Sequence, residues 1–140
     1  MWPRIDGLRT LALGTPGGLR DRLNTLVLTG AKTATAGLLT EYAHEGEELE
    51  HVGERLVLVD DADAPIGVVE ITDVQVRPFA TVPWEFARAE GEGDKSLDAW
   101  RAGHLAYWAR QGETVIDTTG IVCLRFRLVP ADEKQHNRTG

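Results

Sequence analysis

The sequence has little cysteine and no long apolar run. Its single cysteine, Cys123, excludes an internal disulfide, and the apolar neighbours at 121–124 predict a small buried side chain. The apolar run at 11–13 is followed at once by glycine and proline, so it is too short for a signal peptide or a membrane span. These absences favour a reducing compartment, and we expect a cytoplasmic protein with no membrane partner.

A surplus of positive charge is also missing. The formal net charge is −7, which leaves no overall positive field to collect a long polyanion. Any binding of nucleic acid must therefore depend on a local surface, and a short single strand or one nucleoside is a better ligand for this chain than a duplex. The 140 residues show no internal repeat and are enough for one core. We predict one domain over 1–130 and a flexible tail over 131–140; the oligomeric state is left open.

Local patterns in the first half predict one helix and one hairpin. Apolar residues over 19–27 recur at helical spacing, and Gly30 stands where that helix would end. The segment 34–43 fits either a short helix or a strand. Two β-branched stretches, 55–60 and 66–76, are separated by a turn-forming segment, which predicts a hairpin.

The second half predicts two helices and a closing strand. Thr81 and Pro83 are start signals for a helix that ends before Gly91, and Ser96 can cap the next helix. The residues at 121–129 form the last strand. This mixture favours an α+β fold around a small curved sheet or barrel. The second of these helices has an apolar, aromatic face formed by Leu97, Trp100, His104, Leu105 and Trp108.

A lysine motif and an acidic loop carry the groups needed for proton transfer. A desolvated lysine can accept a proton from a threonine while a carboxylate handles a second transfer, and Lys32, Thr35 and Glu92 have these groups. The alternative is a solvated Lys32, a Thr35 that caps the following helix and a Glu92 on an exposed loop. Glycines beside Glu92 allow close approach to a ligand. A divalent cation such as Mg²⁺ is an option for the acidic loop, but no spaced ligand set identifies a metal site.

The aromatic helix has two interpretations. Its rings can stack a nucleobase, as single-stranded recognition requires. Core packing suits Trp100 and Trp108 better, because they share the apolar face, whereas Tyr107 lies off that face and can reach outward. His104 is more often a hydrogen-bonded core residue than a catalytic one.

Two of these stretches resemble the ASCH domain family. Residues 30–35 fit its pattern of glycine, any residue, lysine, two residues and threonine. Residues 90–97, followed by Trp100, Arg101 and His104, resemble the signature of its small bacterial members. The resemblance covers about residues 14–130. It implies a PUA-like small β-barrel with flanking helices, a fold associated with RNA recognition.

The resemblance also implies a cleft in which the lysine motif faces the acidic loop. Some relatives deacetylate N4-acetylcytidine through lysine, threonine and glutamate, others are described as ribonucleases, and many only bind. By this resemblance the catalytic residues are Lys32, Thr35 and Glu92, with Glu90 or Glu85 as alternatives to Glu92. The substrate contacts it implies, with no cofactor, are Gly30, Thr33, Glu90, Asp94, Arg101, His104 and Tyr107.

One position departs from the pattern. Amidohydrolase-type members carry an arginine two residues after the motif threonine, where this chain has Gly37. The loss of a guanidinium removes a contact to a phosphate or a base. Our interpretation is an RNA- or nucleoside-binding hydrolase, either a ribonuclease or an acetylcytidine-type amidohydrolase. The alternatives are a non-catalytic module that binds single-stranded RNA and, last, a regulator that binds proteins.

Overall fold

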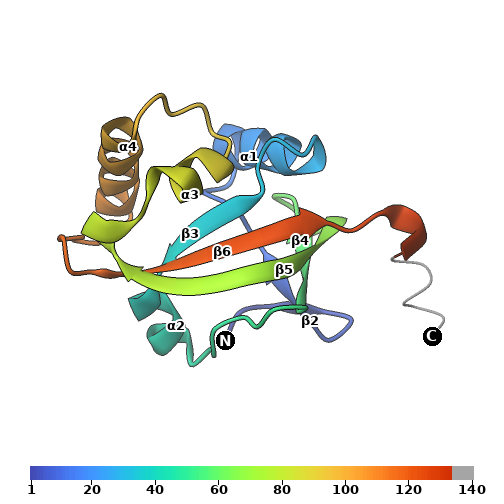
Figure 1. The fold of residues 1–140 in the computed structure, drawn as a ribbon. Helices are drawn as coiled ribbons and strands as arrows, with labels where there is room; N and C mark the ends of the chain where they lie inside the picture. Colours follow the sequence, from blue (N-terminus) through green and yellow to red (C-terminus); the bar gives the residue numbers. More distant parts are fainter. Residues whose placement is uncertain (134–140) are drawn as a thin grey trace.

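The computed structural model describes residues 1–133 as six strands and five helical segments (Figure 1). The predicted helices and the hairpin are present, so the α+β class is confirmed. Of the tail predicted over 131–140, residues 134–140 lie outside the described residues. In chain order the elements are β1 (Arg4–Ile5), β2 (Leu8–Leu11), α1 (Gly18–Leu28), β3 (Ala34–Leu38), α2 (Leu39–Glu45), β4 (Arg55–Val59), β5 (Pro65–Pro78), the 3₁₀ helix η1 (Phe79–Thr81), α3 (Trp84–Ala89), α4 (Leu97–Arg110) and β6 (Gly120–Leu128).

The six strands form one mixed sheet in the order β1-β2-β4-β5-β6-β3. The pairing of β2 with β4 is parallel, and the other pairings are antiparallel. Strand β5, 14 residues long, holds the sheet together, because its residues 65–70 pair with β4 and its residues 69–78 pair with β6. Register irregularities interrupt both ladders, as expected where a long strand bends.

The sheet does not close into the barrel that the family resemblance implied. Closure would require β3 to pair near β2, but β3 pairs only with β6 among the described residues. Thr10 and Leu11 of β2 line the same pocket as Thr35 and Gly37 of β3. If these two strands were paired, their backbones would fill that space. Because they are not paired, the open side of the sheet is a cleft.

The segment 34–43, which fitted both structures, contains both. Strand β3 ends and helix α2 begins at the step from Leu38 to Leu39. The strand forms where β6 offers backbone partners, with Thr35 opposite Leu124. The helix ends at Gly46, whose φ of 66° is the left-handed cap that glycine adopts without a Cβ clash.

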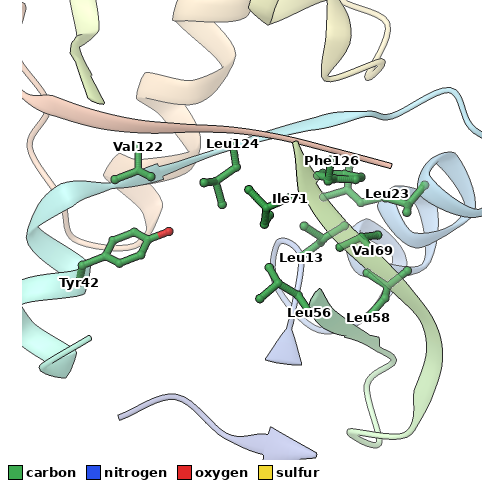
Figure 2. Close-up of a cluster of buried hydrophobic side chains, with 11 residues drawn as sticks. Leu13, Leu23, Tyr42, Leu56, Leu58, Val69, Ile71, Val122, Leu124 and Phe126 are labelled. Carbon is green, nitrogen blue, oxygen red and sulfur yellow. The ribbon is translucent and has the colours of Figure 1, made fainter. Parts of the chain in front are cut away.

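Strand β6 is buried on both faces and separates two apolar clusters. Successive side chains of a strand point to opposite faces, so Ile121 and Cys123 pack with α3 and α4, while Val122, Leu124 and Phe126 pack on the other side. Figure 2 shows the second cluster, in which Tyr42 of α2 joins side chains of β4, β5 and β6. Helices α3 and α4 lie together on one side of the sheet, and α2 lies on the opposite side (Figure 1).

Two sequence-based expectations are corrected or extended, and two are confirmed. The short strands β1 and β2 were not predicted. Leu105, assigned to the apolar face of its helix, is 38% exposed, whereas Trp100 and Trp108 are buried as predicted. Cys123 is buried as predicted. Among the described helices, none has the length and apolar character that a membrane crossing requires.

Helix α4 starts at a side-chain cap that can be tested. Ser96 accepts a hydrogen bond of 3.0 Å from the Ala99 amide, as the sequence predicted. Ser96→Ala should lower the free energy of unfolding by about 1 kcal/mol, because the amide loses its partner. Ser96→Asn should retain most of the stability in the same urea titration, since asparagine caps as well as serine. An equal loss in both variants would contradict the capping role.

Candidate active site

Lys32 is fixed in the loop between α1 and β3 by its own backbone. Its amide donates to the Leu26 carbonyl at 2.9 Å, and the next amide, of Thr33, donates to Ala89 at 2.9 Å. The second bond ties the lysine loop to the end of α3, where the acidic loop begins. The Lys32 side chain is only 1% exposed, so the solvated alternative for this lysine is wrong.

The buried ammonium is held between two carboxylates. Lys32 Nζ lies 2.7 Å from Glu92 Oε2 and 3.5 Å from Glu90 Oε2. Glu90 Oε2 also lies 3.2 Å from His104 Nε2 on α4. A buried charge without a partner is strongly unfavourable, so each member of this group depends on the others. The predicted encounter of the lysine motif with the acidic loop is therefore confirmed by geometry.

The hydrogen bonds of His104 indicate a charged ring. Its Nδ1 lies 2.9 Å from the Trp100 carbonyl oxygen, so Nδ1 carries a proton. Its Nε2 faces the Glu90 carboxylate and must donate as well if that carboxylate is ionised. Burial lowers the His104 pKa, but the hydrogen bond and charge of Glu90 outweigh it and leave the pKa above its usual value.

The net pKa shifts of the two carboxylates have opposite directions. Burial alone would raise the Glu90 pKa, but Lys32 and His104 together lower it below the usual value. The Glu92 pKa is raised, because burial and the neighbouring Glu90 outweigh the attraction of Lys32. When the pair takes up one proton, Glu92 therefore receives it. Glu92 is also the more accessible of the two, with 19% of its side chain exposed against 2% for Glu90.

Gly91 makes this arrangement possible by its close approach to the lysine loop. Its φ is +67°, and a Cβ there would lie 2.0 Å from the Ala31 carbonyl oxygen and 3.0 Å from the Lys32 nitrogen. Only glycine permits both the left-handed conformation and that distance. The glycine thus lets its two neighbours, Glu90 and Glu92, reach the same ammonium.

A cavity of about 530 Å³ opens beside the ion cluster. Lys32, Glu90, Glu92 and His104 line it together with Thr35. Asp94 and Tyr107 also line it, as the resemblance implied and as the outward position of the tyrosine suggested. Within residues 1–133, the Thr35 hydroxyl makes no hydrogen bond to protein. It is thus free for a ligand. Thr35 lies inside β3, so the helix-cap alternative for it is wrong.

The pocket lining is acidic. Six carboxylates face three lysine or arginine side chains, and the arginines are Arg22 and Arg110. Arg22 donates to the Glu92 backbone carbonyl, so part of its capacity is already used. This balance favours an uncharged ligand that donates hydrogen bonds over a chain of phosphates.

Several predicted contacts are not part of this cavity. Gly30 and Thr33 do not line it, and the Thr33 hydroxyl faces the Ala89 carbonyl at 3.3 Å. Arg101 donates to the Ala80 carbonyl at 2.8 Å on another part of the surface, so its predicted role as a substrate contact is not supported by geometry. Glu85 has an 80% exposed side chain that pairs with Arg125, which removes it as an alternative to Glu92.

The sequence reasoning missed several polar residues of the pocket, among them the buried pair Tyr42 and Glu50. The Tyr42 hydroxyl donates to Glu50 at 2.8 Å, and both residues are buried and line the cavity. Glu50 follows three other glutamates over 45–48, a pattern typical of a solvated surface. Nothing in its local sequence marks it as buried.

Three residues of the same cluster carry side chains that can ligate a metal ion. Glu90, Glu92 and His104 each offer one ligand atom, and these atoms lie within 4.8 Å of one another. The Lys32 ammonium contacts both carboxylates, so a divalent cation would have to displace it or bear its repulsion. The donor set therefore suits the ammonium better than a metal ion.

The fold and the site define an α+β domain whose cleft is built on a buried lysine and two glutamates. The chain belongs to the ASCH domain family, whose model matches residues 10–130. A crystal structure of an Enterococcus faecalis protein is similar, with a TM-score of 0.76 and 27% identity over 89% of this chain and 78% of that one. An ASCH domain from Lactobacillus crispatus has a TM-score of 0.75 and 28% identity over 85% of this chain and 77% of that one. A search of curated proteins finds no match.

The close approach at Gly91 gives a first test of the site. Gly91→Ala should destabilise the protein, because the new methyl group collides with the Ala31 backbone. Gly93→Ala is the matched control: its φ of +92° imposes similar backbone strain, but its nearest neighbour is the flexible Arg22 side chain at 3.9 Å. We expect Gly91→Ala to lose about 1–3 kcal/mol more than the control in urea unfolding. Equal losses would mean that the contact is not tight.

The ion cluster predicts a pH dependence. Since the folded-state pKa of His104 is raised, its contribution to stability is complete below the unfolded pKa of about 6.5 and is lost as the pH rises through the folded value. The stability difference between the wild type and His104→Gln should therefore be largest in acid and shrink at alkaline pH. Urea titrations at several pH values measure it. A difference that grows with pH would contradict the proposed pairing with Glu90.

Proposed function

We propose that this chain is a hydrolase that removes an acyl group from the exocyclic amino group of a nucleoside, for which N4-acetylcytidine is the test substrate. The observation that carries the proposal is that Lys32, Thr35 and Glu92 line one cavity, with Lys32 Nζ 2.7 Å from Glu92. A nucleophile, a proton acceptor and a cation are the three groups that amide hydrolysis requires.

The reaction proceeds through an acyl-threonine. Thr35 Oγ1 attacks the amide carbon while Glu92 accepts the hydroxyl proton, and the Lys32 ammonium stabilises the negative charge on the carbonyl oxygen. The C–N bond then breaks as Glu92 returns the proton to the leaving amine. A water molecule attacks the ester, and Glu92 takes the proton of that water and returns it to Thr35. The products are the free amino group and a carboxylic acid.

The division of labour between the carboxylates follows from their surroundings. Glu90 lies between Lys32 and His104, and its lowered pKa keeps it ionised. It serves to hold the ammonium in place. Glu92 has a raised pKa and access to the cavity, and a base works best when its pKa approaches the working pH.

The acidic lining bears on the choice of ligand. Membership of the ASCH family suggests an RNA-related ligand. A phosphate chain would meet six carboxylates in this cavity, and Arg101 does not line it. An uncharged nucleoside avoids this repulsion, so it is favoured over single-stranded RNA as the occupant of the cavity.

Substitutions at the three groups test the proposal. Lys32→Met should lower kcat for N4-acetylcytidine by about 10²–10³-fold, because the oxyanion loses its partner. Glu92→Gln should lower it by about 10²–10⁴-fold, and Thr35→Ala should remove the acyl-enzyme that mass spectrometry would detect. Lys95→Met is the control, since Lys95 is exposed and outside the cavity.

The two alternative functions, a ribonuclease and a non-catalytic RNA-binding module, give different outcomes in the same assay. Hydrolysis should persist in the presence of a chelator, because no step uses a metal ion. Cleavage of short single-stranded RNA without release of acetate from the nucleoside would replace the proposal by a ribonuclease. Salt-sensitive binding of that RNA without turnover of either substrate would replace it by a non-catalytic module.

A further inference from the structure

The cavity contains a second buried polar pair that the reaction does not use. Tyr42 of α2 and Glu50 of the following loop are joined by a hydrogen bond of 2.8 Å, and their residues are 7% and 8% exposed. Figure 2 shows the Tyr42 hydroxyl pointing away from α2 toward the apolar cluster. Both residues line the same cavity as Thr35.

Glu50 has acceptor capacity that the protein leaves unused. A carboxylate accepts about four hydrogen bonds; Tyr42 supplies one, and the backbone amide of Glu50 itself contributes a second. The nearby Arg9 is engaged elsewhere, since its guanidinium binds the Glu54 carboxylate and the Glu48 carbonyl. Burial outweighs the hydrogen bonds from Tyr42 and the Glu50 amide and the charge of Arg9, so the Glu50 pKa is raised and its charge is not fully compensated. Hydrogen-bond donors on a ligand would provide the missing partners.

Strand β3 sets the separation between this pair and the nucleophile. Thr35 and Gly37 lie on the same face of the strand, two residues or about 7 Å apart. A Cβ on Gly37 would be 3.9 Å from the Tyr42 ring. The pair therefore lies one step along the strand from Thr35, which is a separation on the scale of one nucleoside.

The surroundings restrict what can occupy this part of the cavity. Leu11 and Leu13 line it together with Trp2, whose ring meets Tyr42 edge to face at 4.8 Å. A phosphate would be repelled by Glu50 and poorly solvated by these side chains. Two neighbouring hydroxyl groups match a carboxylate well, as carboxylates bind ribose hydroxyls in dinucleotide sites.

We propose that Glu50, supported by Tyr42, binds the vicinal hydroxyl groups of the ribose while the acylated base lies at Lys32, Thr35 and Glu92. The inference rests on the proposed function, because that function places the base beside Lys32, Thr35 and Glu92. It makes the preferred substrate a ribonucleoside and disfavours its 2′-deoxy analogue. The 2′-hydroxyl is the group by which a protein distinguishes the two.

The test compares N4-acetylcytidine with its 2′-deoxy analogue. The wild type should prefer the ribonucleoside by about tenfold or more in kcat/KM, the effect of one hydrogen bond to a charged group. Glu50→Gln keeps the shape of the side chain and its acceptor for Tyr42, and it should reduce that preference severalfold through KM with little change in kcat. Glu48→Gln removes the same charge from an exposed side chain outside the cavity and should behave as the wild type.

The outcomes separate this inference from the proposed function. Turnover of both substrates at equal kcat/KM by the wild type, or undiminished preference in Glu50→Gln, overturns the ribose site and leaves the hydrolase standing. If neither substrate is turned over, calorimetry with cytidine and 2′-deoxycytidine decides the matter. Preferential binding of cytidine that Glu50→Gln abolishes supports the ribose site, and equal or absent binding overturns it.

Discussion

The structure of the site depends on one buried ammonium and the two carboxylates that compensate it. Lys32 is withdrawn from water almost completely, and the charge would be unfavourable without Glu90 and Glu92 within 3.5 Å. Those carboxylates come from a loop about 60 residues further along the chain, so the ion cluster also links the start of β3 to the connection between α3 and α4. His104 extends the link to α4 itself. Lys32 and Glu92, two of the three groups proposed to act in catalysis, therefore also hold these elements together.

This coupling explains why the acidic loop is rich in glycine. The loop must turn sharply and lie against the backbone of Ala31, and a side chain at Gly91 would force the two apart. A loop that only had to be soluble would not need this contact. The left-handed glycine between two acids is consequently a structural requirement of the ion cluster, and it also fixes the different surroundings of Glu90 and Glu92.

Local sequence patterns predicted the elements better than their assembly. The hairpin, the Ser96 cap and the last strand depend on neighbouring residues, so periodicity and turn chemistry were enough to locate them. Strand β2 has only four residues and gave no such signal, and the open sheet follows from how β2 and β3 are placed around the cleft. The lysine motif and the acidic loop were brought together by family resemblance, because no spacing rule spans that distance. Two residues show the limit of this approach. Arg101 belongs to the motif but does not line the cavity, and Glu50 belongs to an acidic run but is buried.

The glycine at position 37 affects both the charge of the cleft and the size of the ligand that the cleft can hold. Amidohydrolase-type members carry an arginine there by the resemblance, and such a side chain would start 3.9 Å from the Tyr42 ring and add a positive charge to the cavity that Glu50 also lines. Glycine leaves that charge out and leaves the space open, so the cavity continues from Thr35 to the Tyr42–Glu50 pair. The carboxylate is then left to a ligand instead of a guanidinium. A cleft that is open at this point and negative along its length can accept a longer, uncharged molecule rich in hydroxyl and amide groups, and it selects against one that carries phosphates.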